Sequence, residues 1–236
     1  MTQSISSASI GRLEALSTPH VLPAFVRVVS RSIVDADAGG PVPARLSDAC
    51  LKRRREFVAG RQCAAEALQL LGAAGWSLEI GTGTAGEPLW PEGYTGSITH
   101  TSTMAACAVA AVGRATSIGL DAEPMVDAAR AARVSRAVLH ACESRLKARG
   151  LDSASLFTLM FSAKESLFKC LYPLVRRRFD YRDAAVRQID VGDRRIVIEV
   201  LTTLAPGYER GLTLTGGFAT GNGVVITGFH IAQGSK

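Results

Sequence analysis

The sequence predicts an α+β protein made of two halves, residues 1–114 and 115–236. Both halves contain helical patterns and several short strand patterns. Glycine-containing turns connect neighbouring strand patterns, which favours a small, mainly antiparallel sheet in each half. With 236 residues and 47% hydrophobic composition, the chain is large enough for each half to bury a core.

The first half reads as a strand, a long helix and further strands. The pattern predicts a strand at 21–29 and a helix at 48–71, capped by Ser47 and closed by Gly72. Residues 81–86 match G-x-G-x-x-G, but the Glu-Pro-Leu-Trp-Pro that follows cannot open the helix of a dinucleotide-binding loop. We expect a turn between short strands there.

The next two segments are predicted to pair as antiparallel strands. The alternation in 96–101 predicts a strand that ends at His100, with Ser97 and Thr99 on one face. The short apolar run 104–112 is bounded by turn signals and is expected to pair back with it.

The second half alternates strand and helix before a run of strands. We expect a strand at 118–124, a helix at 127–148 broken by Gly150, and a helix at 155–171 that stops before Pro173. The remaining patterns predict strands, the last two joined by a Gly-Asn-Gly turn: 186–191, 194–203, 212–219 and 224–231.

Composition narrows the class of partner and the compartment. The formal net charge of +6 favours anionic partners such as phosphates, nucleic acid or an acidic protein. The five cysteines are odd in number and none has CxxC spacing, which argues against a disulfide framework or a zinc site and favours a reducing cytoplasm. Residues 1–17 lack a signal-peptide pattern, and the longest apolar run is too short to span a bilayer.

Two carboxylates end the strand expected at 118–124. Asp121 and Glu123 are two residues apart, so a strand would point both side chains to one face. Adjacent carboxylates repel each other unless a cation lies between them, and oxygen ligands suit Mg²⁺. The alternative is a strand end with two solvated acids.

A second candidate pair lies on the helix expected at 155–171. Glu165 and Lys169 are four residues apart and share a polar stripe between two apolar arcs. An ordinary exposed ion pair is the alternative, but charges on a largely apolar helix need partners.

Basic residues of the first half form a third candidate set. Arg53 and Arg61 are eight residues apart on the expected helix, about 12 Å along its axis, and lie on nearly one side. That spacing suits two phosphates of one extended ligand, and a solvated basic face or a nucleic-acid patch is the alternative. His100, flanked by hydroxyls at a strand end, is the best catalytic candidate among the four histidines, although a lone histidine is more often structural.

Five motifs occur together and in order: Arg-Glu-Phe-x-x-x-Arg-x-Cys-Ala at 55–64, Gly-Glu-Pro-Leu-Trp-Pro at 86–91, Gly-Ser-Ile-Thr-His at 96–100, Ile-Gly-Leu-Asp-Ala-Glu-Pro at 118–124, and Phe-Ser-Ala-Lys-Glu-Ser-Leu-Phe-Lys at 161–169. In this combination the chain, from about residue 53 onward, resembles the phosphopantetheinyl transferases. The resemblance is to the monomeric two-half type of siderophore and secondary metabolism, the enterobactin-synthase branch. It implies a pseudo-two-fold pair of α+β halves.

The resemblance also implies a reaction and a set of residue roles. The expected enzyme transfers the 4′-phosphopantetheine arm of coenzyme A to a serine of an apo acyl, peptidyl or aryl carrier protein and releases adenosine 3′,5′-bisphosphate. Mg²⁺, with Mn²⁺ possible, is expected on Asp121, Glu123 and Glu165. Catalytic roles fall on Glu165, Lys169 and His100, and coenzyme A contacts on Arg53, Arg61, Ser97, Thr99, His100 and Lys169.

Partners and location follow from the same resemblance. We expect carrier proteins of polyketide or nonribosomal peptide synthases, a cytoplasmic monomer, and no nucleic acid or membrane partner. One departure concerns residues 81–85, where some relatives have lysines and this chain has only Gly, Thr and Ala. Two other functions remain open: an Mg²⁺-dependent phosphohydrolase of nucleotide pyrophosphates, and a basic nucleic-acid-binding module.

Overall fold

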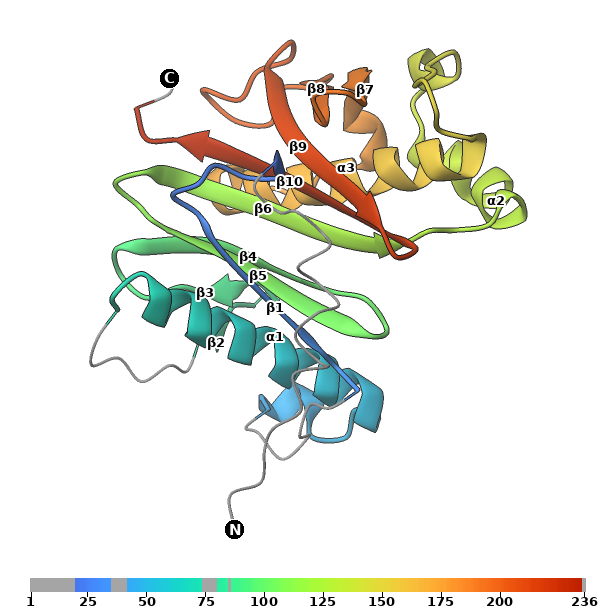
Figure 1. The fold of residues 1–236 in the computed structure, drawn as a ribbon. Coiled ribbons are helices and arrows are strands. Elements are labelled where there is room, and N and C mark those ends of the chain that lie inside the picture. The colour runs from blue at the N-terminus through green and yellow to red at the C-terminus, as the bar shows by residue number, and fades with distance from the viewer. Residues whose placement is uncertain (1–19, 35–41, 74–79, 85, 235–236) are drawn as a thin grey trace.

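The computed structural model describes residues 20–34, 42–73, 80–84 and 86–234 (Figure 1). Within these residues two antiparallel sheets face each other, and a long helix packs on each of them. The predicted α+β class with antiparallel sheets is confirmed. The turn between the two sheets contains Arg114, where the predicted division of the chain falls.

The first sheet has the order β1-β5-β4 and carries helix α1. Its strands are β1 (Arg27–Ser32), β4 (Tyr94–His100) and β5 (Met104–Ala111), and α1 spans Leu51–Leu70. Side chains alternate along β5. Cys107 and Val109 contribute to the core under α1, whereas Ala106 and Ala108 belong to the core between the two sheets. These alanines are small, so the second sheet can approach closely.

The second sheet has the order β6-β10-β9-β8-β7. Its strands are β6 (Ala115–Pro124), β7 (Ala184–Asp190), β8 (Arg195–Val200), β9 (Thr213–Gly221) and β10 (Val224–Ala232). The predicted turn before β10 is confirmed, since Asn222 and Gly223 have φ of 51° and 72°, the left-handed values that a tight two-residue hairpin needs. All four predicted C-terminal strands are present with shifted ends.

Helix α3 (Ser153–Val175) packs on β6 and β10. Asp152 caps it by accepting a hydrogen bond from the backbone N–H of Ser155 at 2.8 Å. The prediction that it stops before Pro173 was wrong, because the helix includes Pro173 and ends two residues after it, at Val175. Pro173 has no backbone N–H and so removes one helical hydrogen bond, a small loss this close to the end of the helix. Arg176 then closes the last turn in the left-handed conformation.

The helix predicted at 127–148 was also too long. Helix α2 spans Ala128–Val138, capped by Asp127, and a short 3₁₀ turn η4 (Ala141–Glu143) follows. The interruption brings the Glu143 side chain into the interior, where it pairs with the ammonium of Lys164. The pattern of apolar residues does not predict this interruption, because Glu143 and its partner Lys164 are 21 residues apart in the chain.

In the first half, the structure differs from two local predictions and agrees with a third. Ser47 does not cap α1; its hydroxyl donates to the carbonyl of Ala44 in the 3₁₀ turn η3 (Ala44–Leu46), and the helix begins at Leu51. The strand predicted at 21–29 begins at Arg27, because Val21 and Leu22 are buried between the sheets outside any strand. The short strands β2 (Gly81–Thr82) and β3 (Pro88–Leu89) flank the predicted turn, of which residue 85 lies outside the described residues.

Side-chain hydroxyls join the two sheets where β4 runs beside β6. The backbone N–H groups of Leu120 and Ala122 donate to the hydroxyls of Ser97 and Thr99, each at 3.0 Å. β6 is an edge strand of its sheet, so these two hydroxyls accept the backbone N–H groups that no neighbouring strand pairs with. This junction places the end of β4 beside the acidic end of β6. Within the described ranges, none of the helices combines the length and apolar character needed to cross a bilayer.

Candidate active site

Asp121 lies at the junction of the two sheets and is 3% exposed. One carboxylate oxygen accepts a hydrogen bond from the ammonium of Lys169 at 2.7 Å and from the hydroxyl of Thr99 at 3.3 Å. The other oxygen, Oδ2, is buried and has no hydrogen-bond partner among the described residues. A buried carboxylate oxygen without a partner is costly, so this side of Asp121 favours a cation.

Close contact between α3 and β6 sets the height of Lys169 above Asp121. Gly119 lies directly against the helix: a Cβ added there would meet the carbonyl oxygen of Ser166 at 1.8 Å and the backbone nitrogen of Cys170 at 2.7 Å. The missing side chain lets the helix backbone rest on the strand. The ammonium of Lys169 therefore also reaches the carbonyl of Leu120, at 3.2 Å.

Glu165 lies one turn before Lys169 on the same face of α3. The hydroxyl of Tyr181 donates a hydrogen bond to Glu165 Oε1. Tyr181 begins the 3₁₀ turn η5 (Tyr181–Asp183), and its ring packs on Phe161 with centroids 5.6 Å apart. Burial and the hydrogen bond to Glu165 raise the pKa of Tyr181, so its hydroxyl remains protonated and acts as the donor.

The ammonium of Lys164 holds this arrangement from the interior. It donates to Glu143 at 2.7 Å, to the carbonyl of Val138 at 3.0 Å and to the carbonyl of Tyr181 at 2.9 Å. The Lys164 and Glu143 side chains are 1% and 0% exposed. A fully buried ion pair with every hydrogen-bonding direction used fixes α2, α3 and η5 relative to one another.

Asp121 and Glu165 both act electrostatically on Glu123. Burial raises the pKa of Glu123 to about 7, and the charges of Asp121 and Glu165 add to the rise, while Lys169 and Arg130 oppose it. The acids are not gathered at ligand distances: within the described ranges, no three His, Cys, Asp or Glu side chains already form a group that could hold a metal ion. One oxygen of Asp121 accepts a hydrogen bond from Lys169, and one oxygen of Glu165 accepts a hydrogen bond from Tyr181.

His100 ends β4 and belongs to a charged cluster with α1. Its Nε2 lies 2.9 Å from Nη1 of Arg53, and its Nδ1 lies 3.8 Å from Oε2 of Glu56. Burial lowers the pKa of His100, with opposing effects from Glu56 and Asp121 and a further lowering by Arg53 and Lys169. Glu56 was not predicted from the sequence, although it lies within the first of the five motifs.

Arg61 does not join that cluster. Its guanidinium donates to the carbonyl of Gly81 at 3.1 Å and to the hydroxyl of Thr82 at 2.9 Å, and it lies over the ring of Phe57. The two predicted arginines of α1 therefore contact different parts of the fold. Arg61 connects α1 to β2.

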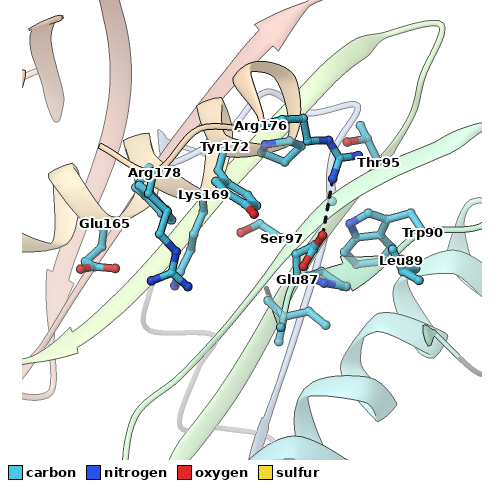
Figure 2. Close-up of a pocket in the computed structure, with 16 residues that line it drawn as sticks. Glu87, Leu89, Trp90, Thr95, Ser97, Glu165, Lys169, Tyr172, Arg176 and Arg178 are labelled. Carbon is cyan, nitrogen blue, oxygen red and sulfur yellow. Dashed lines mark hydrogen bonds and ion pairs between the residues drawn. The ribbon is translucent and has the colours of Figure 1, made fainter. Parts of the chain in front are cut away.

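A cavity of about 510 Å³ lies between β3, β4 and the C-terminal half of α3. Figure 2 shows Glu165, Lys169 and Arg178 at one end and Leu89 and Trp90 at the other. Three of the predicted site residues line it: Ser97, Glu165 and Lys169. The other six do not: Arg53, Arg61, Thr99, His100, Asp121 and Glu123.

Three basic side chains line this cavity: Lys169, Arg176 and Arg178. Arg176 forms an ion pair with Glu87 at 3.4 Å across the two sides of the cavity (Figure 2). Arg176 and Arg178 follow directly after the end of α3, which places them beside the cavity. A second cavity, of about 250 Å³, is lined by Glu165, Phe168 and Arg178 together with Tyr181, so Glu165 borders both.

Comparison with known proteins identifies the family. Residues 42–110 match the model of the 4′-phosphopantetheinyl transferase N-terminal domain, and residues 117–215 match the model of the 4′-phosphopantetheinyl transferase superfamily. Together the two matches cover most of the chain and include all nine predicted site residues.

Individual relatives agree with the models. The chain is 36% identical to 4′-phosphopantetheinyl transferase Svp of Streptomyces mobaraensis, over 80% of this chain and 76% of the relative. It is 39% identical to 4′-phosphopantetheinyl transferase Npt of Nocardia iowensis, over 57% and 59%. It is 35% identical to enterobactin synthase component D of Salmonella typhi, over 58% and 60%. The matches thus span about three fifths of the length of the last two relatives and about three quarters of the first.

The five motifs, the two family models and the relatives lead to one conclusion. The chain belongs to the 4′-phosphopantetheinyl transferases, in the branch of enterobactin synthase component D.

Proposed function

We propose that this protein transfers the 4′-phosphopantetheine arm of coenzyme A to a serine of an apo carrier protein and releases adenosine 3′,5′-bisphosphate. The observation that supports this most strongly is the placement of Asp121, Glu165 and Lys169 at the sheet junction, beside a cavity with three cationic side chains. A pyrophosphate needs such a mixture of carboxylates, for a divalent ion, and cations.

The proposed step forms a bond between the serine oxygen and the β-phosphorus and breaks the bond from that phosphorus to the leaving bisphosphate oxygen. Glu165 takes the serine proton, directly or through a water that it orients. Lys169 lies between β6 and the cavity and stabilises negative charge on the leaving group. His100 adds to that stabilisation from the end of β4.

Asp121, Glu123 and Glu165 are the residues that would hold Mg²⁺ or, alternatively, Mn²⁺. Their chemistry fits such an ion: all donors are carboxylate oxygens, Asp121 has an oxygen without a partner, and burial together with the charge of Asp121 raises the pKa of Glu123. When bound, the ion would neutralise charge on the pyrophosphate and help to orient it. Lys169 hydrogen-bonds to Oδ1 of Asp121 and Tyr181 to Oε1 of Glu165, so Oδ2 of Asp121 is the oxygen that would face the ion.

Coenzyme A contacts are proposed for Arg53, Arg61, Ser97 and Thr99 as well as His100 and Lys169. Arg53 and His100 meet at the end of β4 and suit a phosphate at that point. Ser97 lines the cavity, whereas Thr99 donates to Asp121 and so supports the metal site from behind. Arg176 and Arg178 offer additional positive charge in a chain that lacks lysines at 81–84.

The partner is proposed to be an apo acyl, peptidyl or aryl carrier protein of a polyketide or nonribosomal peptide synthase. The net charge of +6 favours an acidic partner surface. The similarity to enterobactin synthase component D supports siderophore synthesis as one setting. We further propose that the protein works in the cytoplasm as a monomer whose two halves, 1–114 and 115–236, enclose the coenzyme.

Intact-mass spectrometry of an apo carrier protein tests the reaction. Incubation with this protein, coenzyme A and Mg²⁺ should add one phosphopantetheine group to the carrier. Hydrolysis of coenzyme A without any carrier would instead favour the phosphohydrolase, and salt-sensitive retention of nucleic acid without affinity for coenzyme A would favour the nucleic-acid-binding module.

A further inference from the structure

Glu56 lies under His100 and Arg53 and contacts both. Its side chain is 10% exposed, and Oε2 lies 3.3 Å from Nη1 of Arg53 and 3.8 Å from Nδ1 of His100. Lys52 approaches the other oxygen at 3.9 Å. One nearly buried carboxylate of α1 thus faces both the guanidinium and the imidazole at the end of β4.

The contact between Arg53 and His100 determines where the imidazole proton lies. A guanidinium has only N–H donors, so at 2.9 Å from Arg53 Nη1 the Nε2 atom of His100 must be the acceptor. A neutral imidazole carries one proton, which then lies on Nδ1 and faces the carboxylate of Glu56. A proton on Nε2 would point at the guanidinium hydrogens.

We infer that Glu56 is a positioning residue that holds His100 as the Nδ1–H tautomer, with Nε2 directed at Arg53. The charged groups around the ring are Glu56 and Arg53 from α1, Asp121 from β6 and Lys169 from α3. Of the two carboxylates, Glu56 is the one that faces Nδ1. Burial keeps the ring neutral, because it lowers the pKa of His100 from its ordinary value.

This arrangement has a consequence for phosphate binding, which rests on the proposed function. In the ligand-free protein the Nε2 atom of His100 has no proton to donate, and Arg53 is the group that presents hydrogens at this point. A phosphate would bind Arg53 first and draw it from the ring. Glu56 would still face Nδ1 of His100 and hold the ring in place after Arg53 moves.

Nuclear magnetic resonance of protein labelled with ¹⁵N in its histidines tests the inference without any ligand. The chain has four histidines, and the His100→Gln spectrum identifies the resonances of His100. The expected wild-type spectrum shows a protonated Nδ1 and an unprotonated Nε2 in the neutral ring. A proton on Nε2, or an even mixture of tautomers, would overturn the inference.

Two substitutions should move the pKa of His100 in opposite directions, while both raise the share of the Nε2–H form in the neutral ring. Glu56→Gln removes the charge that opposes the burial effect, so the pKa of His100 falls and the Nδ1–H form loses population. Arg53→Met removes the donor to Nε2, so the pKa rises and the Nε2–H form gains population; Arg53 is half-exposed, so this variant should fold. Glu66→Gln is the matched control, because Glu66 lies on the same helix and pairs with Arg31 instead. Indistinguishable spectra of Glu56→Gln and Glu66→Gln would refute a role for Glu56.

Coenzyme A titration of the same samples separates this inference from the proposed function. Glu56→Gln should weaken binding roughly tenfold, about 1.4 kcal/mol, while Glu66→Gln binds like the wild type. Equal affinity of the two variants would remove Glu56 from the coenzyme site. A wild-type protein with no affinity for coenzyme A would end the proposed function but leave the tautomer result intact.

Discussion

The hydroxyl of Tyr181 donates a hydrogen bond to the carboxylate of Glu165, and the backbone carbonyl of Tyr181 accepts one from the buried ammonium of Lys164. Tyr181 thus contacts Glu165 through its hydroxyl, while its backbone is anchored to the core by Lys164. The orientation of the proposed base depends on residues that do not border the larger cavity.

Tyr181→Phe should lower kcat and leave the KM for coenzyme A nearly unchanged. A hydrogen bond to a charged group contributes about 1.5–3 kcal/mol, so its loss should reduce kcat roughly 10- to 100-fold. Steady-state kinetics with an apo carrier protein measure both constants. Tyr208→Phe is the control, because Tyr208 lies in the turn before β9 and lines neither of the two cavities that Glu165 borders. Equal kcat values for the two variants would show that the Tyr181 hydroxyl does not orient Glu165.

Removing one member of the Lys164–Glu143 pair should destabilise the fold strongly. Lys164→Met leaves the Glu143 carboxylate buried without its cation, at a cost of roughly 3–5 kcal/mol. The double variant Lys164→Met/Glu143→Gln should lose less than the sum of the single variants, because neither charge remains. Urea unfolding measures these free energies. Fully additive losses would indicate that the two side chains act independently.

Gly119→Ala should disrupt the seating of α3 on β6. The added methyl group would meet the carbonyl of Ser166 at 1.8 Å, so strand and helix must separate. Overpacking of this kind costs about 1–3 kcal/mol or more, and the shift would move Lys169 away from Asp121. Gly113→Ala is the control, since nothing lies within 4 Å of a Cβ there. The midpoint temperature of thermal unfolding and the transfer activity should both fall in Gly119→Ala and stay unchanged in Gly113→Ala. A Gly119→Ala protein with the stability and activity of the wild type would contradict the described contact.

Thiol reactivity should divide the five cysteines into two groups. Cys50 and Cys142 are exposed, whereas Cys63, Cys107 and Cys170 are buried. Burial raises the pKa of Cys63 to about 11 and that of Cys170 to about 12, and it raises the pKa of Cys107 well above its ordinary value. Because the thiolate is the reactive form, two thiols should react with Ellman's reagent at pH 8 in the native protein and five after unfolding. Rapid reaction of more than two native thiols would contradict the buried positions.

The local features that the sequence predicted well depend on short-range chemistry. The strand that ends at His100, the Asn222-Gly223 turn and the shared face of Glu165 and Lys169 follow from alternation, turn conformations and helix geometry. These rules act over a few residues. They placed each site residue on the correct type of element.

Features that depend on distant contacts could not be predicted. Glu143 ends a helix early because its charge pairs with Lys164, and α3 passes Pro173 because few backbone bonds remain beyond it. Glu56 and Tyr181 were missed for the same reason: their partners, His100 and Glu165, lie 44 and 16 residues away in the chain. The sequence around a single charged or aromatic residue does not indicate which distant residue it will contact in the fold.

The proposal that Asp121, Glu123 and Glu165 share one divalent ion is tested most directly by Mn²⁺ binding. Electron paramagnetic resonance counts free Mn²⁺ in the presence of protein and needs no catalytic turnover. Asp121→Asn, Glu123→Gln and Glu165→Gln should each weaken binding at least tenfold, about 1.4 kcal/mol, relative to the wild type. The exposed Glu92→Gln should bind like the wild type. Equal Mn²⁺ affinity in all five proteins, or no binding to the wild type even with coenzyme A present, would contradict the shared metal site.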